Sequence, residues 1–284
     1  MAVRMDGKAL SAKIREQIKA EAILLKEKTG VVPGLAVIIV GEDPASQIYV
    51  RNKAKACEEV GFKSEIYELP ESTSEEELLE LVHSLNKRDD IHGILAQSPL
   101  PKHLDEALIV NNISYEKDVD AFHPVNVGKI MIGDYSFLPC TPAGCMELLM
   151  EYNINPEGKK CVVVGRSNIV GKPMAMLLLH ANATVTVCHS RTKDLAEITR
   201  QADIVVMAIG KADFLKADMI KQGAVVIDVG MNRNSEGKLT GDVAFEECEK
   251  KASYITPVPG GVGPMTITML MKNTLTSAKK KADR

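Results

Sequence analysis

The chain has 284 residues, of which 45% are hydrophobic and 26% charged, and its formal net charge is -3 at pH 7. This length predicts two domains, and the nearly balanced charge gives no indication of a nucleic acid or an anionic membrane as partner. Aromatic residues make up 4% of the chain, with no Trp, which argues against a stacking surface for nucleic-acid bases.

Three further features predict a cytoplasmic protein without a membrane segment. No apolar run approaches the roughly 20 residues of a membrane span, and residues 1–8 lack the apolar stretch of a signal peptide. The six cysteines contain no CxxC pair, which is typical of reduced and buried thiols. No cluster of His, Cys and Asp has the spacing of a metal site, so no metal is expected. The cysteines stand at positions 57, 140, 145, 161, 188 and 248.

The first half of the chain alternates between helical and strand patterns. Helices are predicted over 6–28, from Pro44 to Val60, and after the capping sequence 72–75, and strands over 35–40, 65–69 and 91–97. This βαβ series predicts a mostly parallel sheet. Residues 111–140 carry few periodic signals and are expected to form a functional loop and a linker.

The second half repeats the alternation, with strands predicted over 161–164, 184–188, 204–209 and 224–229. Residues 257–264 then hold three prolines and three glycines in eight positions, which predicts a segment that cannot be helical. A helix is expected from Met265 to about Lys279, followed by a fraying terminus.

The most informative stretch is CVVVGRSNIVGKP, residues 161–173. An apolar strand ends at Gly165, a polar loop follows, and Gly171 opens a helical pattern. Such a turn directs backbone N–H groups and the positive end of a helix dipole at a pyrophosphate, which predicts a dinucleotide site. The spacing differs from the common GxGxxG, because Ser167 stands at the second position and the last glycine comes one residue late.

The next strand indicates which dinucleotide is bound. An NAD site usually has a carboxylate at the end of this strand, whereas here the strand is followed by His189, Ser190, Arg191 and Thr192. Hydroxyl and guanidinium donors suit a 2′-phosphate, and Arg166 can reach the same region, so NADP is favoured over NAD. The alternative interpretation of these side chains is a solvated loop edge.

Polar groups in the first half mark candidate positions for the chemistry. Tyr49 and Lys53 are four residues apart and share one helix face, and Gln97 stands at the carboxyl end of a predicted strand, where open α/β sheets bind ligands. The alternative for Lys53 is a solvated basic face with its neighbours, and Asp118 and Asp120 are equally suited to a turn.

Six co-linear motifs together resemble the bifunctional methylenetetrahydrofolate dehydrogenase/methenyltetrahydrofolate cyclohydrolase family, over essentially the whole chain. They are Tyr49-x-x-x-Lys53-x-Lys55, Gln97-x-Pro99-Leu100-Pro101, Lys117-Asp118-Val119-Asp120-x-Phe122-His123-Pro124, Pro139-x-Thr141-Pro142-x-Gly144, Gly165-Arg166-Ser167-x-x-Val170-Gly171-x-Pro173 and Pro259-Gly260-Gly261-Val262-Gly263-Pro264-Met265-Thr266.

The resemblance implies an NADP-dependent oxidation of 5,10-methylenetetrahydrofolate, followed by hydrolysis of the methenyl product. It implies that Lys53 is the catalytic lysine, Gln97 orients it, Asp120 holds the pterin and Tyr49 stacks near the aminobenzoate ring. The implied folate-binding loop comprises Pro259, Gly260, Gly261 and Val262. The implied NADP-binding residues are Gly165, Arg166, Ser167, Ser190, Arg191 and Met231.

The predicted fold is therefore a two-domain α/β protein with a ligand cleft between the domains. Residues 1–140 are expected to form the catalytic, folate-binding α/β domain with a mostly parallel sheet. Residues 141–268 are expected to form a Rossmann-like NADP-binding domain, and the C-terminal helix 269–284 to pack back on the first domain. The resemblance also implies a homodimer with tetrahydrofolate derivatives as substrates.

Three positions depart from the family pattern, and two other functions remain open. Ser98 replaces a leucine beside Gln97, Ala121 replaces a glycine after Asp120, and Met231 replaces an isoleucine. An NADP dehydrogenase of a small hydroxy acid, similar to shikimate dehydrogenase, shares the architecture but does not account for the loop 259–264. A regulator that binds NADP without catalysis would not need the lysine, amide and carboxylate together.

Overall fold

The computed structural model describes residues 1–233 and 237–283, which divide into two compact units. The six-stranded unit comprises Met1–Ala12 and Pro139–Thr266, and the three-stranded unit comprises Lys13–Leu138 and Ile267–Arg284. The predicted first domain, residues 1–140, differs from these units at its beginning. Residues 1–12 join the six-stranded unit because β1 (Val3–Arg4) pairs in parallel with β11 (Tyr254–Ile255).

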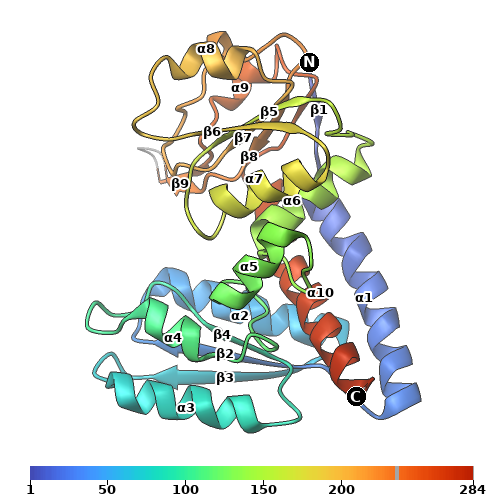
Figure 1. Ribbon diagram of the computed structural model, residues 1–284, viewed down its shortest axis with the longest axis vertical. Coiled ribbons are helices and arrows are strands. Elements are labelled where there is room, and N and C mark those ends of the chain that lie inside the picture. Colours follow the sequence, from blue (N-terminus) through green and yellow to red (C-terminus); the bar gives the residue numbers. More distant parts are fainter. Residues whose placement is uncertain (234–236, 284) are drawn as a thin grey trace. The chain divides into compact units, whose positions relative to one another are not determined.

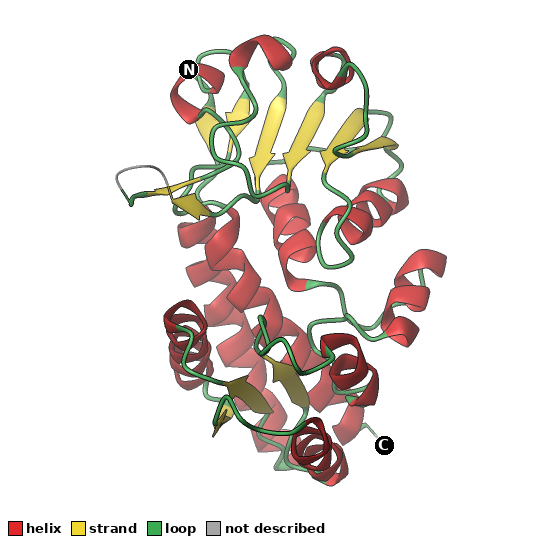
Figure 2. Cartoon of the chain, turned by 90° about the vertical axis from the view of Figure 1, so that its left-hand side faces the viewer, coloured by secondary structure: helices red, strands yellow, loops and turns green. Residues whose placement is uncertain are grey.

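A parallel sheet forms the centre of the six-stranded unit (Figure 2). Its strand order is β1-β11-β8-β7-β5-β6, so β6 lies on one side of β5, and β7 and β8 lie on the other. The loops that leave β5 and β7 therefore diverge, and such a switch point is where open α/β sheets bind ligands. The strands are β5 (Lys160–Val164), β6 (Thr184–Cys188), β7 (Ile204–Met207) and β8 (Val225–Asp228).

Helices cover both faces of this sheet (Figure 1). They are α6 (Cys140–Glu151), α7 (Gly171–His180), α8 (Leu195–Arg200) and α9 (Phe245–Cys248), with a short 3-10 helix at Ala217–Met219. Alternate valines such as Val162 and Val164 of β5 pack in one core with Leu195 and Ile198 of α8. A short antiparallel pair, β9 (Asn232–Arg233) and β10 (Leu239–Thr240), follows β8 in the chain. The near-continuous apolar strands are those expected of a parallel sheet buried on both faces.

The three-stranded unit is built on a second parallel sheet, in the order β3-β2-β4. Every residue of the central strand β2 is buried. The strands are β2 (Gly34–Val40), β3 (Lys63–Leu69) and β4 (Gly93–Ala96), and the helices are α2 (Pro44–Val60), α3 (Glu75–Lys87), α4 (Glu106–Asn112) and α5 (Pro124–Ile132). Two long helices, α1 (Gly7–Thr29) and α10 (Val262–Ala282), begin in residues of the six-stranded unit and continue in the three-stranded unit.

Local signals explain where these helices begin. The side chain of Ser74 accepts from the backbone N–H of Glu77, whose carboxylate accepts from the N–H of Ser74, so α3 starts with a complete capping box. The apolar face of α3, with Leu78, Val82 and Leu85, packs on the sheet in one buried core. The predictions for α2 and α3 are thereby confirmed.

Two predictions of irregular structure were wrong. The segment 111–140, expected to be loop and linker, contains α5, which starts at His123 as N-cap and ends at Gly133 in the left-handed conformation, with φ 81°. The glycine- and proline-rich segment is also not wholly irregular, because α10 begins at Val262 and takes in Gly263 and Pro264. Proline is tolerated in the first turn of a helix, where its missing N–H costs nothing.

Contacts of α10 fix its later part in the three-stranded unit. The side-chain amide of Asn273 donates to the carbonyls of Val119 and Leu138 at 2.7 and 2.8 Å, and the hydroxyl of Ser277 donates to the carbonyl of Glu116 at 2.9 Å. These bonds hold the segment after β4 against the helix.

Candidate functional site

Helix α2 carries Tyr49 and Lys53 in the three-stranded unit. The carboxylate of Asp43 caps its start by accepting from the N–H of Ser46 at 2.7 Å, and Gly61 ends it with φ 77°. Val50 and Cys57 of the helix are buried, whereas Tyr49 and Lys53 are half-buried. The helix thus holds both polar side chains at the margin of the core.

Gln97 follows the carboxyl end of β4, and its side chain meets Lys53. The ammonium of Lys53 donates to Oε1 of Gln97 at 2.9 Å, and Nε2 of Gln97 donates to the carbonyl of Ser98 at 2.7 Å. The second bond orients the amide, because its nitrogen is engaged and its oxygen is left toward the lysine. Two residues that lie 44 positions apart in the chain are therefore joined by a hydrogen bond, which fixes the position of the lysine ammonium.

Asp120 lies in a loop that a buried carboxylate holds in place. Asp118 accepts from the backbone N–H of His123 and from Nδ2 of Asn126, both at 2.8 Å, and burial raises the pKa of its carboxyl group. A parallel bridge joins Ile94 of β4 to Asp118. The chain thus runs alongside β4 toward its carboxyl end, where Gln97 lies, and Asp120 follows within two residues.

The three departures from the family pattern fall in different surroundings. Ala121 is completely buried with φ 60°, a left-handed conformation that costs an alanine about 1–2 kcal/mol and explains the glycine of the pattern. Ser98 is exposed, and its hydroxyl contacts the carboxylate of Glu106. Met231 is 51% exposed. Of the three, Ala121 alone strains the backbone, directly beside Asp120.

A cavity of about 260 Å³ lies in the six-stranded unit at the carboxyl ends of β5, β6 and β7. Gly165, Arg166 and Ser190, all predicted to bind a dinucleotide, are among its lining residues. The others are Val164, His189, Leu195, Ala208, Ile209, Lys211 and Phe214. The structure therefore brings the predicted phosphate loop and the end of the second strand to one cavity.

Two glycines let segments of the predicted phosphate loop pack closely on neighbouring backbone. A methyl group at Gly165 would lie 2.3 Å from the carbonyl oxygen of Ala208, and φ there is 136°. A methyl group at Gly171 would lie 2.2 Å from the carbonyl oxygen of Gly165. Both contacts are with backbone, so a larger residue must displace the strand or the helix that the loop connects. These positions fit a dinucleotide held close to the main chain.

Three other predicted cofactor residues have different contacts. The hydroxyl of Ser167 accepts from the N–H groups of Val170 and Gly171 at 3.2 and 3.3 Å, so it supports the start of α7. Arg191 is exposed, with its N–H donating to Nδ1 of His189 at 3.1 Å. Met231 follows β8 on the surface. Their roles toward a cofactor stay predictions.

Two buried aspartates that the sequence analysis did not identify organise the loops near this cavity. Asp242 accepts from the backbone N–H groups of Ile209, Gly210 and Lys211 at 2.7–3.1 Å. Asp228 accepts from the N–H groups of residues 230, 242 and 243, all at 2.9 Å, and burial raises its pKa to about 7. The position of Asp228 at the end of an apolar strand was a signal for it, whereas only the folded chain reveals Asp242.

The loop predicted to bind folate packs against the start of α1. The N–H of Lys8 donates to the carbonyl of Gly260 at 3.1 Å, and the N–H of Gly261 donates to that of Pro257 at 2.8 Å. A methyl group on Gly7 would lie 1.8 Å from the carbonyl oxygen of Gly261. Pro259 is exposed and Val262 is buried, so the loop offers its tip to solvent.

Comparison with known proteins decides the family. Residues 5–120 match the tetrahydrofolate dehydrogenase/cyclohydrolase catalytic domain, and residues 139–282 match the NAD(P)-binding domain of the same enzymes. The chain belongs to the tetrahydrofolate dehydrogenase/cyclohydrolase family. Bifunctional protein FolD of Moorella thermoacetica is 60% identical over 97% of this chain and 98% of that protein.

Solved structures of the tetrahydrofolate dehydrogenase/cyclohydrolase family agree. The bifunctional FolD enzyme of Campylobacter jejuni has a TM-score of 0.97 at 56% identity, covering 99% of both chains. The Trypanosoma brucei FolD enzyme, solved with NADP cofactor and an inhibitor, has a TM-score of 0.94 at 44% identity over 98% of both chains. Shikimate 5-dehydrogenase of Thermus thermophilus has a TM-score of 0.53 at 16% identity over 87% of this chain and 99% of that one, a likeness of fold alone.

The described residues offer neither a helix that could span a membrane nor a metal site. Among residues 1–233 and 237–283, no helix combines the length and hydropathy of a membrane span. Within the same ranges, no three His, Cys, Asp or Glu residues are grouped to hold a metal ion.

Proposed function

We propose that this chain oxidises 5,10-methylenetetrahydrofolate with NADP+ and hydrolyses the 5,10-methenyl product to 10-formyltetrahydrofolate. The observation that carries the proposal is the ammonium of Lys53 held by Gln97 at 2.9 Å. This pair lies within the part of the chain that matches the family's catalytic domain. A regulator that only binds a nucleotide would not need an oriented lysine together with the loop that carries Asp118 and Asp120.

The oxidation step needs orientation more than proton transfer. The reacting carbon is flanked by two nitrogens, and a nitrogen lone pair stabilises the cation left when hydride departs. NADP+, when bound, supplies the hydride acceptor. The chain contributes binding and alignment: Gly165 and Gly171 allow the close backbone packing that shapes the loop, and Arg166, Ser190 and Lys211 offer donors around the cavity.

The hydrolysis step needs a group that moves protons. Water attacks the carbon of the methenyl cation, and a ring C–N bond breaks as the carbonyl forms. One of the two water protons ends on the departing nitrogen and the other is released to solvent. We assign this transfer to Nζ of Lys53, with Oε1 of Gln97 fixing the direction of its N–H bonds. Separate requirements in the two steps make Lys53 essential for hydrolysis and much less important for oxidation.

Folate recognition is assigned to residues of both matched regions. A carboxylate accepts two N–H donors at once, so we assign the pterin edge to Asp120. Burial raises the pKa of Tyr49, which keeps its hydroxyl protonated and its ring neutral for stacking on the aminobenzoate group. Pro259, Gly260, Gly261 and Val262 are assigned to the folate, and Ser167, Arg191 and Met231 to NADP.

A two-part assay on the purified protein tests the proposed function. Methylenetetrahydrofolate is supplied with NADP+ or, in parallel, with NAD+, and reduced cofactor and methenyl intermediate are followed separately. Reduced NADP without lasting methenyl is the expected result. Accumulating methenyl would refute the hydrolysis step, and the absence of reduced cofactor with either nucleotide would refute the oxidation.

We also propose a homodimer and a cytoplasmic location. Strand β6 is the outer strand of its sheet, and Val187 on it is 39% exposed, which offers an edge for a second copy. Light scattering coupled to size exclusion tests the dimer, and a monomeric mass would refute it. The six cysteines are free and buried, as suits a reducing compartment.

A further inference from the structure

A second cavity, of about 350 Å³, opens in the three-stranded unit away from the proposed catalytic residues. It lies at the amino end of β4, where Ile91 and His92 precede the strand, whereas Gln97 follows the carboxyl end. His92 and Gln97 are five positions apart, so about 16 Å of extended chain lies between them. The other walls come from the end of α3, the segment 114–117, α5, residues 136–137 and the end of α10.

The lining of this cavity carries an excess of positive charge. Five cationic residues and two acidic residues are among those that line it. Burial is the main cause that lowers the pKa of Lys117, and the neighbouring ammonium of Lys281 lowers it further. The cations are Arg88, Lys117, Lys129, Lys280 and Lys281, and the carboxylates are Asp89 and Glu116.

These cations differ in how they are neutralised. Lys281 pairs with Asp89 at 2.8 Å, and Arg88 pairs with Glu65 and Asp90. By contrast, the ammonium of Lys129 lies 5.0 Å from the centre of the Tyr115 ring, and that of Lys280 contacts the hydroxyl of Ser136. Both of these partners are neutral, so they leave the two ammonium charges in place.

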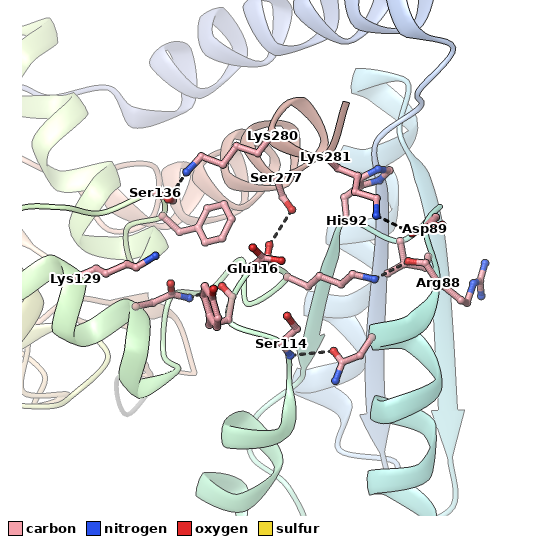
Figure 3. A pocket seen from close by; sticks show the side chains of 16 residues that line it. Arg88, Asp89, His92, Ser114, Glu116, Lys129, Ser136, Ser277, Lys280 and Lys281 are labelled. Carbon is pink, nitrogen blue, oxygen red and sulfur yellow. Dashed lines mark hydrogen bonds and ion pairs between the residues drawn. The ribbon is translucent and has the colours of Figure 1, made fainter. Parts of the chain in front are cut away.

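Figure 3 shows how these groups surround the cavity. Lys129, Ser136 and Lys280 lie on one side of the view, and Arg88, Asp89 and His92 on the other. Donors thus approach from α5, from α10 and from the segment before β4. A ligand between them needs several acceptors that point in different directions.

His92 supplies the observation that points to a ligand. Its side chain is 3% exposed, and Nδ1 accepts from the backbone N–H of Gly34 at 3.1 Å. The neutral ring therefore carries its proton on Nε2, on the side away from Gly34. Burial lowers the pKa of His92 to about 4, so the ring is neutral at physiological pH.

The Nε2–H group of His92 has no hydrogen-bond partner among the residues that the structure describes. A buried donor without an acceptor is unfavourable and rare in folded proteins. His92 lines the cavity, and a small displacement of the side chains that cover Nε2 would let an oxygen of a bound molecule accept from it.

We propose that this cavity binds a phosphate monoester, a small organic molecule with one terminal phosphate. A phosphate monoester carries a charge of about -1.5 to -2 at pH 7 and has three strong acceptor oxygens. It matches the ammonium groups of Lys129 and Lys280, whose ring and hydroxyl partners are neutral and which approach from two helices, whereas a carboxylate has only two oxygens. Tyr115 and Phe137 in the lining provide apolar surface for the organic part. The proposal is independent of folate and NADP binding.

Residue-resolved NMR with glycerol 3-phosphate as the probe tests the position of the site. We expect saturable shifts of the amide signals of Ser114, Lys129 and Ser136, with glycerol and acetate at the same concentrations causing none. Shifts confined to the loop 165–171, which also suits phosphate, would overturn the proposal. So would the absence of any saturable shift, or equal shifts with acetate.

Charge variants test which side chains bind the probe. Lys280→Gln and Lys129→Gln are each expected to raise the Kd for glycerol 3-phosphate about tenfold, the effect of losing one charged hydrogen bond. Lys279→Gln is the matched control, because it removes the same charge from the adjacent position of α10 without facing the cavity. An equal loss of affinity in the control would show general charge attraction and overturn the proposal.

His92→Phe tests the buried donor. It is expected to raise the Kd for the probe while all five cations remain, and unchanged affinity would overturn the proposal, because His92 is the observation that points to a ligand. The lysine variants decide the proposal even where the phenylalanine variant unfolds, because Lys280 is exposed and Lys129 is half-buried.

Discussion

The bond between Lys53 and Gln97 allows the division between the two proposed activities to be tested quantitatively. Gln97→Leu removes the acceptor but keeps a side chain of similar size. A hydrogen bond to a charged group contributes about 1.5–3 kcal/mol, and about 1.36 kcal/mol corresponds to a tenfold change in rate. If the bond at 2.9 Å orients Nζ for proton transfer, cyclohydrolase kcat should fall about 10- to 150-fold.

The dehydrogenase rate of Gln97→Leu should change only a few-fold, because hydride transfer is assigned no proton-transferring side chain. Lys53→Met should abolish cyclohydrolase activity far more completely than dehydrogenase activity. The double variant should be no slower in hydrolysis than Lys53→Met, since Gln97 acts through the lysine. Lys55→Met, an exposed lysine on the same helix, is the control that should leave both rates unchanged.

Both rates are measured on one preparation, by following methenyltetrahydrofolate consumption and NADP+ reduction separately. Three results would refute the reasoning. Equal losses of both activities would mean that the pair acts in substrate binding. Additive losses in the double variant would mean that Gln97 acts independently of Lys53. A loss of either rate in Lys55→Met would mean that the overall positive charge of the helix, and not Lys53 itself, supports the rate.

Four further predictions follow from single contacts. Asp120→Ala should weaken folate binding about tenfold or more in equilibrium titration, through loss of a charged hydrogen bond, and unchanged affinity would reject its assigned role. Gly171→Ala should sharply reduce NADP affinity, because its methyl would lie 2.2 Å from a carbonyl oxygen, whereas Gly128→Ala, with open space around it, should not. Arg166→Met should lower the ratio of NADP to NAD affinity about tenfold by loss of a charged contact, and an unchanged ratio would place the arginine outside the 2′-phosphate site. Burial lowers the pKa of His92 to about 4, so the free energy of unfolding should be roughly 3 kcal/mol higher above pH 6.5 than below pH 4, and the difference is lost as the pH falls through this range. His92→Phe should flatten that part of the profile of unfolding free energy against pH, measured with urea. A profile identical to that of the unchanged protein would contradict the argument.

Periodicity and caps predicted most of the regular structure because those signals are local. The buried run of β2, the start of α2 at Pro44 with its end at Val60, and the capped start of α3 appear where the sequence placed them. Helix α5 was not predicted because apolar residues such as Val125, Val127 and Met131 are exposed on it. Its sequence therefore does not show the alternation of a polar and an apolar face that is typical of a helix. Its cap signals, a proline at the first position and Gly133 after the last, were present but not read as such.

Motif order in the sequence determined the family and identified the candidate residues, since six short patterns in one order are specific even where each is weak. The sequence also located the glycines of the dinucleotide loop. What it left open was whether polar side chains on separate elements meet. The alternative of a solvated basic face for Lys53 was decided by its bond to Gln97, which depends on α2 and β4 lying next to each other.

Only the tertiary structure decided which segments line the same cavity. The basic cavity is made by residues 86–92, 114–117, 126–129, 136–137 and 277–281, and no local pattern links them. Likewise, Asp242 organises the loop 209–211 from more than 30 positions away. Local propensity and hydrophobic period act over a few residues, and they fix where elements begin and which face is buried. Contacts between distant segments depend instead on strand order and helix packing, so the partner of each buried polar group is set only when the chain is folded.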